Sequence, residues 1–193
     1  MSSTKQHRHF LLHKPYGYLS QFIHNQTKRK NQRMLGELYD FPEGTMSIGR
    51  LDKDSEGLLL LTTDGKVSAR ITGRKVEKEY WVQVDGLITE EAVIALREGV
   101  VITVNGKPYT TLPAEVFALP ERPDFPTRAR PVRDDRHGPT SWVSITIREG
   151  KFRQVRKMTA AAGFPTLRLV RVRVGEWRLG DFRPGYVEEV ALG

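Results

Sequence analysis

The sequence contains no cysteine, which excludes disulfide bonds, thiolate-bound zinc and thiol catalysis from this chain. That composition is typical of a reducing compartment, and we expect the protein to be cytoplasmic. Long apolar runs are also absent, so the sequence predicts no membrane-spanning helix. Residues 1–9 are polar and lack the apolar centre of a signal peptide. We expect them to form a short, basic, disordered leader.

Acidic residues are in short supply. The 193 residues include 31 Lys plus Arg against 23 Asp plus Glu, which leaves a net charge of +8. A basic chain that mixes Arg, Lys and aromatic side chains suits RNA better than a membrane surface. The sequence shows no internal repeat, and its length allows one large domain or two small subdomains.

The most informative stretch is a polar turn followed by leucines. Charged and small residues fill positions 49–57, and four leucines follow at 58–61. Because Gly57 and the Asp64-Gly65 turn bound the leucines, the run predicts a strand buried on both faces. The preceding loop should then lie at the rim of a sheet, with its carboxylates beside an apolar core. Active sites favour such positions.

Three interpretations of this turn compete. It could be a solvated polar turn, or a calcium loop in which Asp52, Asp54 and Glu56 take positions one, three and five. The calcium interpretation fails because position twelve is Thr63 and leucines replace the coordinating oxygens of the second half. The third interpretation is a catalytic carboxylate, which needs partners elsewhere in the chain. We interpret Asp54 and Glu56 as structural.

Periodicity places the remaining elements. We expect strands over 10–13, 58–61, 79–84, 142–147 and 167–174, and helices over 66–71, 89–98 and 152–162. In 167–174, alternation places Leu167, Leu169, Arg171 and Arg173 on one face. Residues 120–139 hold five prolines and five arginines without periodicity, and this pattern predicts a long loop insertion. Strands outnumber helices, so the class is α+β with a largely antiparallel sheet.

Four motifs together resemble one family. They are Lys14-Pro15-x-Gly17, the stretch 49–59, Lys78-Glu79-Tyr80, and the segment from Glu149-Gly150 to Lys157-Met158. In this order and spacing they are similar to the RsuA-type ribosomal RNA pseudouridine synthases (RsuA, RluB, RluE and RluF). The resemblance spans about residues 10 to 190. The tail at 159–169 is most similar to the RluE branch, which acts on large-subunit (23S) rRNA.

The resemblance implies a fold and an activity. It implies the pseudouridine synthase fold, a largely antiparallel mixed sheet flanked by helices, with two α+β subdomains that share a central cleft. Residues 10–193 would form the catalytic domain, without the S4-like N-terminal domain that many relatives carry. The implied reaction isomerises uridine in ribosomal RNA. The reaction exchanges no electrons and no net water, so we expect no cofactor and no metal. We also expect a monomeric enzyme.

The resemblance also assigns roles to residues. Asp52 is implied as the catalytic nucleophile or base. Tyr80 would stack on the uracil and move a proton at C5. Arg156 would pair with the Asp52 carboxylate and keep it ionised. Arg50 would fill the vacated base stack or hold phosphate, and Leu169 would wall the pocket.

RNA contacts complete the predicted site. Lys28, Arg29, Lys30 and Arg153 are the expected phosphate or base contacts, together with the arginines of the insertion. Taken singly, each site residue has an ordinary structural explanation, such as a strand aromatic or a solvated helix charge. Two alternatives stay open: the same chemistry on 16S rRNA or tRNA, or a non-catalytic RNA-binding or ribosome-assembly module. The intact Asp52 argues against the second alternative.

Overall fold

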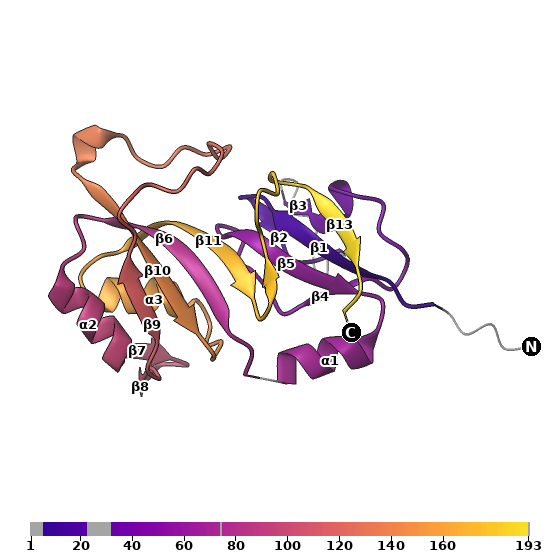
Figure 1. Ribbon diagram of the computed structural model, residues 1–193, viewed down its shortest axis with the longest axis horizontal. Helices are drawn as coiled ribbons and strands as arrows, with labels where there is room; N and C mark the ends of the chain where they lie inside the picture. The colour runs from indigo at the N-terminus through magenta and orange to yellow at the C-terminus, as the bar shows by residue number, and fades with distance from the viewer. Residues whose placement is uncertain (1–5, 23–31, 74, 193) are drawn as a thin grey trace, which may run out of the picture. The chain divides into compact units, whose positions relative to one another are not determined.

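The computed structural model describes residues 6–22, 32–73 and 75–192. The chain divides into two compact units (Figure 1). Unit 1 comprises Met1–Arg74 and Leu179–Gly193, and unit 2 comprises Lys75–Arg178. Neither unit contains, within the described ranges, a helix long and apolar enough to cross a membrane.

Unit 1 is built around the leucine strand. Its elements are β1 (His9–Lys14), β2 (Tyr18–Leu19), β3 (Arg33–Met34), η1 (Leu35–Glu37), β4 (Met46–Ile48), β5 (Glu56–Thr62), α1 (Gly65–Gly73) and β13 (Val187–Val190). β1 pairs antiparallel with β5 and β13, β4 pairs antiparallel with β5, and β2 and β3 form a short parallel pair. The four leucines of β5 are at most 1% exposed, which confirms the predicted strand buried on both faces.

Unit 2 is a second α+β assembly. Its elements are β6 (Lys78–Asp85), α2 (Glu90–Glu98), β7 (Val101–Val104), β8 (Lys107–Thr110), β9 (Glu115–Ala118), η2 (Asp135–His137), β10 (Thr140–Ile147), α3 (Gln154–Ala161), β11 (Thr166–Val174) and β12 (Trp177–Arg178). β6 lies between β11 and β10, β9 pairs with β10, and all these pairs are antiparallel. The helix predicted over 89–98 is confirmed as α2, and the Thr89 hydroxyl caps it by accepting the Ala92 amide at 3.2 Å. The α+β class and the largely antiparallel pairing are confirmed.

The core of unit 2 lies between one face of this sheet and the helices α2 and α3. Alternate residues of neighbouring strands point to this face. The buried apolar side chains of the cluster are Val82, Val84, Ile102, Val116, Val143, Ile145, Ile147 and Leu169 from the strands, with Val93, Leu96, Val155 and Met158 from the helices. Tyr80 packs against the same cluster and is half-buried.

Part of the 120–139 loop packs on the opposite face of the sheet. Phe125 lies between Trp81 and Trp142, with ring centroids 5.8 and 5.7 Å away. The Arg168 guanidinium lies over the Phe125 ring at 5.6 Å and donates to the Pro126 carbonyl at 2.8 Å. β6 is therefore covered on both faces, which explains why three successive residues of it, 82–84, are buried.

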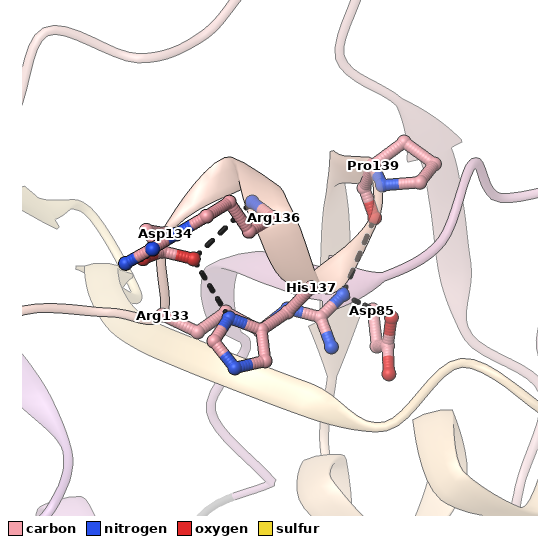
Figure 2. Close-up of polar contacts among 6 residues, drawn as sticks. All are labelled: Asp85, Arg133, Asp134, Arg136, His137 and Pro139. Atoms are coloured by element: carbon pink, nitrogen blue, oxygen red, sulfur yellow. Dashed lines mark hydrogen bonds and ion pairs between the residues drawn. The ribbon is translucent and has the colours of Figure 1, made fainter.

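A second set of contacts fixes the end of the loop to unit 2 (Figure 2). Arg133 forms an ion pair with Asp85 of β6, and it donates to the Pro139 carbonyl at 3.4 Å. Asp134 accepts from Arg136 at 2.7 Å and lies 2.8 Å from the His137 ring nitrogen. The Arg136 side chain lowers the pKa of Asp134 by hydrogen bonding. Arg133 and Arg136, which the sequence offered for RNA, are thus engaged within unit 2.

The expected faces of β11 need a correction. The pairing of β11 with β6 shifts between Thr166 and Arg168 and again between Arg171 and Arg173. A bulge of one residue turns all later side chains to the other face. Arg171 therefore lies opposite Tyr80, whereas Arg173 lies opposite Glu79 and donates to its carboxylate at 3.2 Å. The prediction that Arg171 and Arg173 share a face is wrong.

Candidate active site

The Asp52 loop joins β4 to β5 in unit 1. Gly49 has a φ of 71° and Gly57 a φ of 111°, values that glycine adopts without a Cβ clash. Between them the chain turns tightly, and the Ser55 amide donates to the Asp52 carbonyl at 3.0 Å. Asp52 is half-buried, Ser55 beyond it is buried, and Arg50 before it is exposed. The sequence prediction of a carboxylate at the rim of an apolar strand therefore holds for the local geometry.

A neighbouring turn of unit 1 holds this loop in place. The Ser20 hydroxyl donates to the Leu51 carbonyl at 2.7 Å and accepts the Leu51 amide at 3.0 Å. The Gly17 amide donates to the Lys53 carbonyl at 2.8 Å. The two neighbours of Asp52 in the chain are thus tied to Gly17, the last residue of the Lys14-Pro15-x-Gly17 motif, and to Ser20, which follows it.

The lysine of that motif is fully buried. The Lys14 ammonium donates to the carbonyls of Pro15 at 3.0 Å and Tyr18 at 2.8 Å. Burying an ammonium is costly unless its protons find acceptors, and these carbonyls satisfy two of them. Lys14 therefore shapes the turn that supports the Asp52 loop. Lys28, Arg29 and Lys30, the predicted phosphate contacts, lie outside the described residues.

Unit 2 places Tyr80 and Leu169 on one face of its sheet. Tyr80 lies opposite Arg171, and Leu169 lies opposite Val82, two residues further along β6. Leu169 is 4% exposed and belongs to the core cluster that Val155 of α3 also joins. The same face that carries Tyr80 and Leu169 is thus packed against α3, the helix that carries Arg156.

The helix α3 begins later than the sequence predicted. We expected a start at Phe152, but the first helical residue is Gln154. Arg153 adopts the left-handed conformation with a φ of 52°, which ends any helical path before it. That conformation costs about 1 kcal/mol or more for a residue with a Cβ, so the surrounding turn must impose it.

Glu149 imposes this turn through three hydrogen bonds. Its carboxylate accepts the Leu112 amide at 2.9 Å, the Gln154 amide group at 2.7 Å and the Tyr109 hydroxyl. The Gln154 side chain in turn accepts the Lys151 amide at 3.0 Å. Residues 149–154 are therefore tied to the segment that follows β8, and this fixes the direction from which α3 starts.

Electrostatics around this turn follow from its contacts. Burial raises the pKa of Glu149, but hydrogen bonds from Tyr109, Leu112 and Gln154 outweigh that effect, so the pKa lies below its ordinary value. The hydrogen bond between the Tyr109 hydroxyl and the Glu149 carboxylate also raises the pKa of Tyr109. Burial, followed by the positive charge of Arg171, lowers the pKa of Lys78.

Replacing Glu149 with Gln should destabilise the protein at neutral pH. A glutamine presents an amide group to at least one of the three donors, so about 1 kcal/mol or more should be lost. The folded-state pKa of Glu149 is lowered, so its contribution is present above the unfolded pKa and disappears as the pH falls through the folded value. Urea unfolding at pH 7 and at about pH 3 should show a difference in unfolding free energy between the variant and wild type that is smaller at the lower pH.

The control is Glu115→Gln, which changes an exposed carboxylate on β9. A Glu149→Gln difference that is equal at both pH values would contradict this account.

The structure groups the predicted site residues by unit. Arg50 and Asp52 lie in unit 1, whereas Tyr80, Arg153, Arg156 and Leu169 lie in unit 2. The sequence did not predict the supporting roles of Ser20 and Glu149. For Ser20 the sequence offered no signal except its position after a Pro/Gly turn. Glu149 belonged to a motif, but nothing in the motif indicated that its carboxylate anchors the turn. In the described ranges no group of three or more His, Asp and Glu side chains is placed to hold a metal ion.

Comparisons with known proteins agree with these motifs. A sequence model of the family described as RNA pseudouridylate synthase matches residues 8–161. The chain is 48% identical to the ribosomal large subunit pseudouridine synthase E of Xanthomonas axonopodis pv. citri, over 90% of this chain and 89% of that protein. It is 45% identical to the protein of the same name from Vibrio parahaemolyticus, over 94% of this chain and 73% of that protein. The chain also matches a crystal structure of a pseudouridylate synthase with a TM-score of 0.74 and 28% sequence identity. The match covers 96% of this chain and 71% of the chain in the crystal structure.

Proposed function

Because this chain belongs to the RNA pseudouridylate synthase family, we propose that it converts a uridine of large-subunit ribosomal RNA to pseudouridine. The observation that carries the substrate is the 48% identity to a large-subunit synthase across nearly the full length of both proteins. The proposal includes a monomeric enzyme that acts in the cytoplasm on 23S rRNA.

The proposed reaction is an isomerisation with a closed balance of atoms. The bond between N1 of uracil and C1′ of the ribose breaks, the base turns, and a bond forms between C5 and C1′. The proton on C5 leaves and N1 gains a proton. No electrons and no net water are exchanged, so the chain's own side chains suffice for every step.

Asp52 supplies the central group in this proposal. Its carboxylate acts as the nucleophile or base that assists departure of the base. The rigid loop around it supports that role, because both of its neighbours are tied to Gly17 and Ser20. Arg156 is proposed to pair with this carboxylate and keep it ionised and aimed.

Tyr80 and Leu169 are proposed to contact the uracil. A uridine inside a duplex is out of reach, so the base must be flipped out or taken from a loop. The Tyr80 ring would stack on the base, its phenol would move the C5 proton, and Leu169 would wall the pocket. Arg50 would fill the place that the base leaves, and Arg153 would hold a neighbouring phosphate.

Mapping pseudouridines in total RNA from a strain that lacks this gene tests the proposal. We expect one or a few uridines of the large-subunit rRNA to lose the modification, and the wild-type gene to restore it. A gene encoding Asp52→Asn should fail to restore it. Loss of pseudouridine only from small-subunit rRNA or tRNA would contradict the proposed substrate. If no RNA loses pseudouridine, the proposed enzymatic activity is contradicted.

The basic run at residues 28–30 should carry part of the RNA affinity. Replacing Lys28, Arg29 and Lys30 together with Gln should weaken RNA binding, because counterions are released when a phosphate is neutralised. The slope of log affinity against log salt should fall by about 0.7 for each phosphate of single-stranded RNA that the variant no longer neutralises. Lys66→Gln, an exposed charge on α1, is the control. If the triple variant binds RNA like wild type at every salt concentration, the run is ordinary surface.

A further inference from the structure

The most exposed large apolar side chain in the described ranges belongs to Phe152, at 70% exposure. It lies in the turn that precedes α3, beside Arg153 and two residues before the buried Gln154. Single exposed apolar residues are common on protein surfaces, so exposure alone carries no function. The setting of Phe152 adds three further observations.

The first is that the turn is rigid. Glu149 and Gln154 tie it to the segment after β8 through the hydrogen bonds described above, and Gln154 also closes it by accepting the Lys151 amide. A backbone held in this way loses little conformational freedom when the side chain that it carries binds a ligand. The backbone that carries the exposed Phe152 ring is therefore preorganised.

The second is the charge around the ring. Residues 149–157 contain four basic residues, Lys151, Arg153, Arg156 and Lys157, against the single acid Glu149, which leaves +3. The acid is occupied by the three donors of the turn. The surroundings of the ring are therefore complementary to a polyanion.

The third is that two lysines are held close to aromatic rings. The Lys157 ammonium lies 5.3 Å from the centre of the Phe152 ring and donates to the Thr103 carbonyl at 2.9 Å. The Lys151 ammonium lies 4.9 Å from the centre of the Tyr109 ring. Both ammonium groups are thus held near the turn that carries Phe152.

We propose that Phe152 is a stacking platform for an unpaired base of the RNA, separate from the uridine that reacts, with Lys151 and Lys157 contacting its phosphates. The inference deepens the proposed function, since it takes single-stranded RNA as the ligand. Aromatic side chains combined with basic residues are the common way in which proteins hold single strands, because every base has a face that can stack. The site would help to retain the strand while the target base is out of its helix.

The test measures binding of an oligouridylate of about 12 nucleotides that carries a fluorescent base analogue, 2-aminopurine, at its centre. Phe152→Ala should weaken binding about 5- to 150-fold, the range that loss of one stacked base produces, and should abolish quenching of the analogue. Phe152→Trp should restore both. Phe117→Ala, which removes a ring 47% exposed on β9 of the same unit, is the matched control and should bind like wild type.

A second ligand separates stacking from charge. Inorganic polyphosphate has no bases, so Phe152→Ala should bind it like wild type, whereas Lys151→Gln with Lys157→Gln should bind both ligands more weakly. Equal oligouridylate affinity of wild type and Phe152→Ala would overturn the proposal. The proposal would also be overturned if Phe152→Ala lost as much affinity for polyphosphate as for the oligouridylate. Neither binding assay requires catalysis, so a failed isomerisation assay with intact quenching would overturn the proposed function and leave the platform standing.

Discussion

Asp52→Asn is expected to abolish pseudouridine formation while affinity for RNA stays close to that of wild type. The substitution is nearly isosteric, so the loop between Gly49 and Gly57 should keep its hydrogen bonds to Ser20 and Gly17. What disappears is the carboxylate to which the proposal assigns the nucleophilic or basic role. Removal of a group of this kind costs at least about 10³-fold in rate.

Release of tritium from C5-labelled uridine in RNA measures the reaction, and a binding titration accompanies it. Asp40→Asn changes an exposed aspartate of unit 1 and should leave both unchanged. Turnover by Asp52→Asn within about tenfold of wild type would sink the assignment. A parallel loss of binding and turnover would instead make Asp52 a binding residue.

Tyr80→Phe is expected to lower the rate by about 10²- to 10⁴-fold, the usual contribution of a positioned proton donor or acceptor. The phenylalanine ring keeps the stacking surface, so RNA affinity should change little. Tyr80 is held on β6, between β10 and β11. Helices and the 120–139 loop cover the two faces of β6, so the ring of the variant should occupy the same place.

Single-turnover kinetics with excess enzyme separate the chemical step from binding for this variant. Tyr186→Phe removes a phenol that is half-exposed in unit 1, and it serves as the matched control. If Tyr80→Phe reacts as fast as wild type, the phenol has no part in proton transfer. If Tyr80→Ala then loses only affinity, the role of Tyr80 is stacking alone.

Local sequence signals were sufficient where one element decides its own structure. Four successive leucines bounded by turns are enough to indicate that β5 is a buried strand, and Thr89 caps α2 through a bond within three residues. The faces of β11 could not be predicted in this way. Its two bulges depend on the register with β6, which is set by side chains far away in the sequence.

The start of α3 failed for a related reason. Residues 152–154 have ordinary helix propensity, but Glu149 and Gln154 divert the chain into a left-handed residue at Arg153. Tertiary hydrogen bonds of this kind override local preference. The motifs therefore supplied the residues to which the proposal assigns the chemistry. The structure adds the contacts that hold their segments, those of Ser20 with the Asp52 loop and those of Glu149 with the turn before α3.

The most direct test is pseudouridine formation by the purified protein on transcribed large-subunit rRNA, small-subunit rRNA and tRNA from the same cell. The protein is dialysed against EDTA beforehand, and modified positions are mapped by carbodiimide labelling and primer extension. We predict pseudouridine at discrete positions of the large-subunit RNA alone, and none with Asp52→Asn. Pseudouridine in only the other two RNAs, or in none of the three, would contradict the account.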